Sequence, residues 1–271
     1  MIPLRAAVFD LDDTLLRDDL SISPFTMETL RKLSASGFTL VAASGRAKMS
    51  MLPFVKRIGC VPLYIACNGA EIWDTEKDEL LHSEMFSADL AREIASFGVE
   101  HGVYAQTYAG EYFFYNERSP YAERYAAASV LKGKYVGDLR DFIREPRNKI
   151  LMMAEEDQIA AMLTEARERF AGRASVTCSK AYFLEFNPPG ATKGTALEFV
   201  SDYLGIPLSE FVAFGDSLND LPMFRAAGRS VIVANGRKDV RPLCDDVCPG
   251  NMEDGVARYL AGHFLSGEEK L

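Results

Sequence analysis

The feature that most constrains the fold is a short apolar run that ends abruptly in acidic residues. Residues 6–9 read Ala-Ala-Val-Phe, and Asp10-Leu11-Asp12-Asp13-Thr14 follows directly. A continuous apolar run of this length is typical of a strand buried on both faces, as in a parallel sheet. The carboxylates then lie at the C-terminal end of that strand. We therefore expect an α/β protein, in which ligands bind beyond the carboxyl ends of the strands.

Further strand signals in the first 80 residues also end in polar groups. A strand expected at residues 38–43 leads into Ser44-Gly45-Arg46, and one at 63–67 leads into Asn68-Gly69. Another apolar run follows at 70–73. Because Asn-Gly between two apolar runs is a strong signal for a two-residue turn, the sequence predicts a hairpin here.

The middle of the chain has a different character. Paired strand signals and intervening helical patterns predict an α+β module with an antiparallel sheet. The strand pairs are expected at residues 103–108 with 111–115 and at 175–179 with 182–186, and the helices at 88–97 and 158–170. Strand and helix alternation resumes after Asn187-Pro188-Pro189-Gly190, which is typical of a linker. We therefore predict a discontinuous α/β core, residues 1–80 and 188–271, interrupted by an inserted domain at 81–187.

Composition excludes several function classes. The chain has 30 Lys plus Arg against 39 Asp plus Glu, a net charge of −9, which argues against binding a nucleic acid polymer. Its five cysteines form no C-x-x-C pair and it has three histidines, so neither a disulfide framework nor a zinc site is expected. We find no signal-peptide pattern and no apolar stretch suited to a membrane. A cytoplasmic enzyme is expected, and the sequence leaves its oligomeric state open.

Polar residues that carry chemistry recur at the expected strand ends and helix starts. Each motif alone has an ordinary explanation as a turn, a helix cap or a solvated residue. Together they point to one site, because the carboxyl ends of parallel strands share an edge of the sheet. These candidates are Asp10 and Asp12 after the first strand, Ser44 after the second, Lys193 at a helix start, and Asp216, Asn219 and Asp220 after a strand expected at 211–214.

Taken as a set, these motifs resemble those of a known superfamily. Asp10-Leu11-Asp12-Asp13-Thr14-Leu15, Ser44-Gly45-Arg46, Lys193-Gly194 and Gly215-Asp216-Ser217-Leu218-Asn219-Asp220 look like the four motifs of haloacid dehalogenase (HAD) superfamily phosphohydrolases. Asn68-Gly69 and Glu253-Asp254-Gly255-Val256 are similar to its Cof-like (type IIB) branch, which carries a large α/β cap between the second and third motifs. The resemblance implies a Rossmann-like parallel-sheet core with an inserted α+β cap domain.

The resemblance also implies a mechanism, that of a phosphatase using Mg²⁺. Asp10 would be the nucleophile that forms an aspartyl-phosphate, and Asp12 would protonate the leaving oxygen and then deprotonate water. The metal would be held by the carboxylates of Asp10 and Asp216 and by the backbone carbonyl of Asp12. This is chemically sensible, because a phosphate dianion repels a carboxylate until its charge is neutralised, and Mg²⁺ prefers oxygen ligands.

The remaining motif residues would bind or orient the phosphoryl group. Asp220 would orient a metal-bound water or Lys193, and Arg46 would either stabilise its loop or reach the substrate. Asp13 is taken as a turn residue. The phosphoryl oxygens would be bound by Ser44, Asn219, Lys193 and the backbone amides of Leu11 and Gly45.

These considerations favour hydrolysis of a small phosphorylated metabolite, such as a sugar phosphate. A phosphomutase on the same scaffold is the alternative. A phospho-acceptor signalling module fits less well, because such modules are about half as long and lack the insertion. The inserted segment is rich in aromatic residues, among them Tyr104, Phe113, Tyr121 and Tyr125, which either pack or stack on a substrate; packing is the commoner use.

Overall fold

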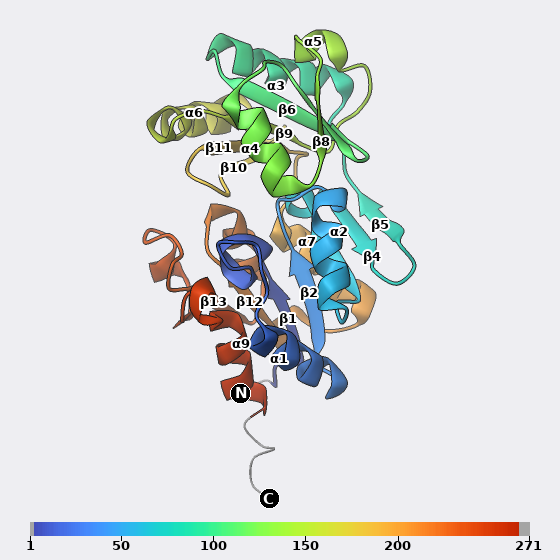
Figure 1. The fold of residues 1–271 in the computed structure, drawn as a ribbon, viewed down its shortest axis with the longest axis vertical. Coiled ribbons are helices and arrows are strands. Elements are labelled where there is room, and N and C mark those ends of the chain that lie inside the picture. Colours follow the sequence, from blue (N-terminus) through green and yellow to red (C-terminus); the bar gives the residue numbers. More distant parts are fainter. Residues whose placement is uncertain (1–2, 266–271) are drawn as a thin grey trace, which may run out of the picture.

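The computed structural model describes residues 3–265, which form two sheets placed one above the other along the longest axis of the molecule (Figure 1). We call the part built on the eight-stranded sheet the core and the part built on the six-stranded sheet the cap. The core strands are β1 (Ala6–Phe9), β2 (Thr39–Ala43), β3 (Leu63–Ala66), β4 (Glu71–Asp74), β5 (Glu79–Ser83), β12 (Phe211–Gly215), β13 (Arg229–Val233) and β14 (Asp246–Cys248).

The core sheet has the order β14-β13-β12-β1-β2-β3-β4-β5. All neighbours from β14 to β3 pair in parallel, whereas β3, β4 and β5 are antiparallel. The helices that cover it are α1 (Pro24–Ala35), α2 (Lys48–Ile58), α7 (Lys193–Leu204), α8 (Leu221–Ala226) and α9 (Gly255–Leu260). Side chains of α1, α2 and α9 pack on one face, and those of α7 and α8 on the other. This arrangement confirms the expected parallel-sheet α/β core.

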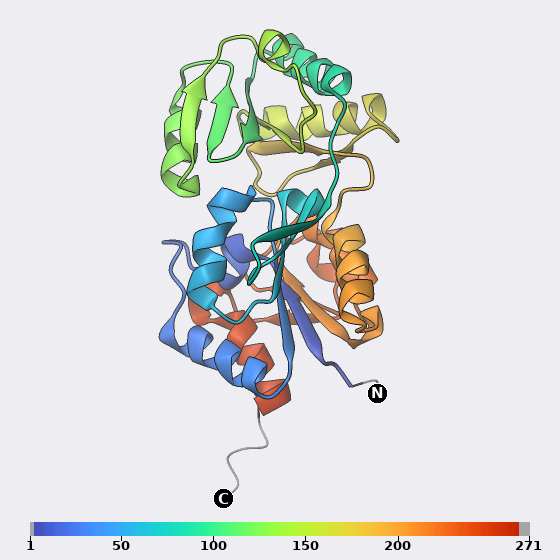
Figure 2. The ribbon, with the colours of Figure 1, turned by 90° about the vertical axis from the view of Figure 1, so that its right-hand side faces the viewer.

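The cap sheet has the order β10-β11-β9-β6-β7-β8. Its elements are α3 (Ala88–Glu100), β6 (Tyr104–Ala109), β7 (Tyr112–Tyr115), α4 (Pro120–Ser129), β8 (Lys132–Tyr135), α5 (Leu139–Phe142), β9 (Ile150–Met153), α6 (Glu156–Arg169), β10 (Ser175–Thr177) and β11 (Phe183–Asn187). Helices α3, α5 and α6 pack on one face, and the other face turns toward the carboxyl ends of the core strands (Figure 2).

One pairing in the cap departs from the antiparallel sheet that the sequence predicts. Strands β7 and β8 pair in parallel, and the other pairs are antiparallel. The reason is α4, which lies between β7 and β8 in the chain and provides the crossover that a parallel pair requires. The predicted domain boundary at residue 80 falls within β5, which belongs to the core sheet. The division into two domains stays a prediction.

The predicted hairpin at Asn68-Gly69 is present, with a longer connection than a two-residue turn. Strands β3 and β4 are antiparallel and Ala66 pairs with Glu71, so four residues connect them. Gly69 has φ +108, and a Cβ there would lie 2.2 Å from the backbone oxygen of Thr192. The loop is therefore packed directly against the start of α7. Within residues 3–265, we find no helix that is long and apolar enough to cross a membrane.

Candidate active site

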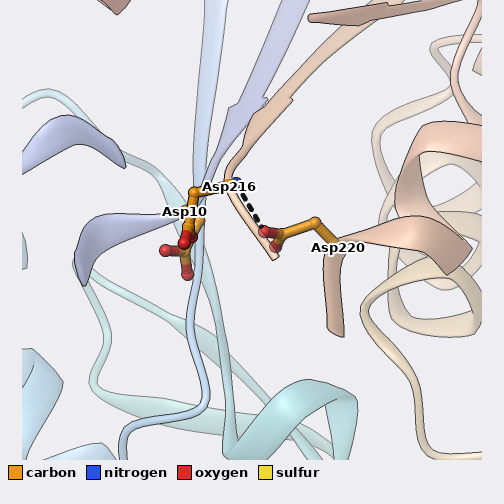
Figure 3. Close-up of side chains that lie close together, drawn as sticks. All are labelled: Asp10, Asp216 and Asp220. Carbon is orange, nitrogen blue, oxygen red and sulfur yellow. Dashed lines mark hydrogen bonds between the residues drawn. The ribbon is translucent and has the colours of Figure 1, made fainter. Parts of the chain in front are cut away.

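Three carboxylates meet at the carboxyl edge of the core sheet. Asp10 follows β1, and its backbone N–H donates to the carbonyl of Phe214 at 2.9 Å, in the neighbouring strand β12. Asp216 follows β12 directly, so the two carboxylates emerge side by side. With Asp220 they offer oxygen atoms that all lie within 4.8 Å of one another (Figure 3). The structure thus brings together acidic residues that are more than 200 positions apart.

Asp220 reaches back toward the strand end and fixes the loop between itself and β12. Its Oδ2 accepts hydrogen bonds from the backbone N–H groups of Asp216 and Ser217, at 2.8 and 3.0 Å; Figure 3 marks the first. The side chain lies against Gly215, where a Cβ would be 2.4 Å from the carboxyl carbon of Asp220. Glycine is therefore required at this position, because any side chain would displace Asp220.

Lys193 neutralises part of this acidic cluster. It begins α7, and its Nζ donates to Oδ1 of Asp10 at 2.5 Å and to Oδ1 of Asp220 at 2.6 Å. The Lys193 side chain is 0% exposed. Burial opposes its charge, but the two carboxylates outweigh burial and raise the pKa of Lys193. The geometry supports the role of Asp220 in orienting Lys193.

The cluster still carries more negative charge than Lys193 can balance. Burial raises the pKa of Asp10 to about 8, and Asp220 and Asp12 add to this shift while Lys193 opposes it. Burial, together with Asp220 and Asp10, also raises the pKa of Asp216 well above its ordinary value. A hard divalent cation with oxygen ligands would relieve this repulsion. The residues present therefore fit Mg²⁺.

Asp12 lies at the edge of this cluster and is held by Arg46. Nε and one terminal nitrogen of Arg46 each donate to a carboxylate oxygen of Asp12 at 2.7 Å. Burial alone would raise the pKa of Asp12, but the guanidinium outweighs it and the pKa lies below its ordinary value. The other terminal nitrogen of Arg46 donates to Ser50 Oγ and to the carbonyl of Ala128 in α4. Arg46 therefore stabilises its own loop and connects Asp12 with the cap.

Of the other predicted phosphate-binding residues, Ser44, Gly45 and Asn219 line the space in front of the carboxylates, whereas the side chain of Leu11 is fully buried. Ser44 is buried at the end of β2, and its Oγ accepts a hydrogen bond from the backbone N–H of Arg46 at 3.1 Å. Asn219 donates through Nδ2 to Asn68 at 3.1 Å, and its Oδ1 has no partner among the described residues. Leu11 and Gly45 follow β1 and β2, at the same edge of the sheet.

A cavity of about 260 Å³ lies between the core and the cap. Its core side includes Asp10, Asp12, Asp13, Ser44, Gly45, Arg46, Asp216 and Asn219. Its cap side includes Tyr121, Arg124, Tyr125, Lys149, Leu151, Met153, Lys180, Tyr182, Phe183 and Glu185. By contrast, the aromatic residues Tyr104 and Phe113 are packed inside the cap, as the commoner use of such residues predicts.

Sequence reasoning did not find the charged cap residues of this cavity. Lys180 Nζ bonds Asp13 Oδ2 at 3.2 Å, and Lys149 bonds Glu185. Asp13 has φ +57, in keeping with a turn residue, and is also a contact for the cap. The available signal was Glu185, a charge between apolar residues of the strand Phe183–Asn187. A charge in such a strand is rarely buried without a partner.

The fold and the site together define an α/β protein with an acidic cluster at the carboxyl edge of a parallel sheet, covered by a cap. The chain belongs to the family of haloacid dehalogenase-like hydrolases, whose model matches residues 7–260. This confirms the family that the motifs indicate. Together with relatives that are named phosphatases, this makes the protein a HAD-type phosphatase, a phosphoric monoester hydrolase.

Two relatives and one solved structure illustrate the similarity. A protein of Cronobacter sakazakii named HMP-PP phosphatase is 31% identical over 85% of this chain and 84% of its own. A protein of Bacillus subtilis named 5-amino-6-(5-phospho-D-ribitylamino)uracil phosphatase is 29% identical over 94% of this chain and 96% of its own. The crystal structure of a haloacid dehalogenase-like hydrolase from Bacteroides thetaiotaomicron is 27% identical, with a TM-score of 0.84, and covers 96% of this chain and 100% of its own.

Proposed function

We propose that this phosphatase uses Mg²⁺ and hydrolyses a small phosphorylated metabolite through an aspartyl-phosphate at Asp10. The observation that carries the proposal is the buried contact between Asp10 and Lys193 beside a second carboxylate, Asp216. This arrangement provides a nucleophile and positive charge at the same point. Both are needed when a carboxylate attacks a phosphate dianion.

The metal would be held by the carboxylates of Asp10 and Asp216 and by the backbone carbonyl of Asp12. When bound, Mg²⁺ would neutralise charge on the phosphoryl oxygens. Lys193 would add a point charge beside Asp10, with Asp220 holding it in place. Ser44, Asn219 and the amides of Leu11 and Gly45 would bind the phosphoryl oxygens that face the loops.

The chemistry would proceed in two displacements at phosphorus. A carboxylate oxygen of Asp10 forms a bond to phosphorus, the bond to the leaving oxygen breaks, and Asp12 donates a proton to that oxygen. Water then attacks the phosphorus while Asp12 accepts its proton, and the bond to Asp10 breaks to release phosphate. The ion pair with Arg46 favours the ionised form of Asp12, which suits the second step.

The cap side of the cavity favours a flat, partly apolar leaving group. It is built largely from Tyr121, Tyr125, Leu151, Met153, Tyr182 and Phe183. Two of its cations already have acidic partners, Lys149 with Glu185 and Lys180 with Asp13. We therefore propose that a phosphorylated heterocycle is a better substrate than a simple sugar phosphate. The uracil derivative in the name of the Bacillus subtilis relative is a compound of this kind.

The first experiment is a screen for phosphate release from a panel of phosphorylated metabolites in the presence of Mg²⁺. We expect several heterocyclic phosphates to be hydrolysed faster than hexose phosphates, and excess chelator to abolish activity that Mg²⁺ then restores. A phosphomutase would instead return the phosphoryl group to the substrate without net release. Full activity in excess chelator would refute the metal assignment.

The Asp10→Asn variant tests the nucleophile. It removes the nucleophilic charge with almost no change in volume, so we expect turnover of an aryl phosphate to be lost while the fold persists. Asp202→Asn, at an exposed position on α7, is the matched control and should keep full activity. Substantial Mg²⁺-dependent turnover by Asp10→Asn would overturn the mechanism.

The Asp12→Ala variant tests the proton donor. The loss in kcat should be greatest for substrates with poor leaving groups, because these most need protonation of the leaving oxygen. The measurement is kcat across a series of aryl and alkyl phosphates of increasing leaving-group pKa. An equal loss for every member of the series would rule out the acid role.

A further inference from the structure

The cap contributes a buried ion pair that none of the catalytic steps uses. Lys149 lies immediately before β9, and Glu185 lies within β11. The two side chains bond each other and are 3% and 1% exposed. Replacing a buried ion pair by apolar residues often leaves stability unchanged or improves it, so stability alone does not account for such a pair.

This ion pair contacts the loop that follows β2 in the core. Lys149 Nζ donates to the backbone carbonyl of Gly45 at 2.6 Å. The carboxylate of Glu185 lies against the same residue, because a Cβ built on Gly45 would be 3.2 Å from its Oε1. The second oxygen of Glu185 accepts a hydrogen bond from the backbone N–H of Ser179 at 3.1 Å. The pair is therefore fixed in the cap and directed at one peptide group of the core.

That peptide group joins Gly45 and Arg46, and both its oxygen and its N–H are hydrogen-bonded. Lys149 binds its oxygen, and its N–H donates to Ser44 Oγ at 3.1 Å. Because Ser44 Oγ accepts this hydrogen bond, its own hydroxyl hydrogen is available to a partner in the cavity. The orientation of the peptide therefore governs the orientation of the Ser44 hydroxyl.

We propose that Lys149 and Glu185 are positioning residues, through which the cap holds the Ser44–Gly45 loop in the conformation that binds the phosphoryl group. The inference rests on the proposed function of that loop. Lys149 acts on the peptide and not on the leaving group. Its ammonium group donates one hydrogen to Glu185, which balances its charge, and another to the backbone carbonyl of Gly45. A defect in the pair should therefore affect all substrates alike.

The test compares Lys149→Met with the wild-type enzyme. We expect kcat/KM to fall by about 10- to 100-fold for an aryl phosphate and for the best metabolite alike, since a hydrogen bond from a charged group to the loop is lost. Competitive inhibition by inorganic phosphate, which probes the loop without turnover, should weaken by a similar factor. Lys149→Arg, which keeps the charge and can donate to both partners, should restore much of the loss.

Two further variants separate positioning from a purely structural role. Lys132→Met removes an exposed ion pair between β8 of the cap sheet and Glu111, which lies in the turn before β7, and should leave kcat/KM and phosphate inhibition unchanged. The double variant Lys149→Met/Glu185→Leu replaces the buried pair by apolar residues. It should unfold at a temperature close to that of the wild type and still show the full loss of phosphate binding.

Specific results would overturn the proposal. If folded Lys149→Met were inhibited by phosphate as strongly as the wild-type enzyme, the pair would not position the loop. Recovery of both stability and activity in the double variant would show that the pair is structural only. A loss confined to one substrate would make Lys149 a contact for the leaving group. Failure of the proposed function itself would look different, because Asp10→Asn would then keep substantial Mg²⁺-dependent turnover.

Discussion

Replacing Lys193 by methionine tests whether the acidic cluster depends on that one buried cation. The substitution keeps the length of the side chain and removes its charge, leaving Asp10 and Asp220 without the partner that Nζ provides at 2.5 and 2.6 Å. Removing one partner of a buried ion pair lowers the free energy of unfolding by about 3–5 kcal/mol. At about 2 °C per kcal/mol for a chain of this size, the unfolding temperature should fall by roughly 6–10 °C.

The loss of stability in Lys193→Met should be greater at high pH than at low pH. The pKa of Asp10 is raised by burial, and removing Lys193 takes away the group that opposes this shift. A carboxyl whose pKa is higher in the folded than in the unfolded state binds more protons when folded, so its stability contribution falls as pH rises. The deficit of Lys193→Met should therefore be larger near pH 8 than near pH 5, where protonation relieves the uncompensated charge.

The measurement is urea denaturation with chelator present, followed by the fluorescence of Trp73, which is the single tryptophan and lies in β4 of the core sheet. Lys132→Met, whose side chain is 66% exposed, is the control and should change the free energy of unfolding by less than about 0.5 kcal/mol. The reasoning would be refuted by a deficit below about 1 kcal/mol near pH 8, or by a deficit that grows on acidification.

Two further substitutions test local packing. Gly215→Ala should destabilise the core by about 1–3 kcal/mol and lower kcat, because the new Cβ would lie 2.4 Å from the carboxyl carbon of Asp220. Gly262→Ala is the control, because a Cβ at that position meets open space, and it should change neither stability nor kcat. Ser23→Ala should cost about 1 kcal/mol in urea denaturation without changing kcat, since Ser23 Oγ accepts from the N–H of Thr26 at 3.0 Å at the start of α1, away from the cavity. An unchanged kcat in Gly215→Ala, or a changed one in Ser23→Ala, would contradict these assignments.

Much of the core could be predicted because its signals are local. The apolar run at Ala6–Phe9 becomes a fully buried central strand, and the capped start of α7 places Lys193 at the first position of its helix. Each of these features depends on residues within a few positions of one another. The sequence also predicted that the site residues lie close together, since the carboxyl ends of parallel strands meet at one edge of any such sheet.

The cap shows where local signals end. Helix α4 and strand β8 lack a distinctive pattern in the sequence, and β8 is exposed at every position, so the parallel pair of β7 and β8 had no hydrophobic signature. Lys149 likewise reads as an ordinary charged residue, and Glu185 shows only that a charge within a largely apolar strand needs a partner, not which partner. Their burial follows from the meeting of two sheets, which no local periodicity describes.

The sequence by itself determined the core: which strands are buried, where the acidic and hydroxyl residues follow them, and to which family the motifs point. Only the tertiary structure decided which charges pair. Lys193 bonds a carboxylate 183 positions away, and Lys149 binds a carbonyl 104 positions away. The physical reason is that burial makes a charge require a partner, whereas the identity of that partner depends on which surfaces meet when the chain folds.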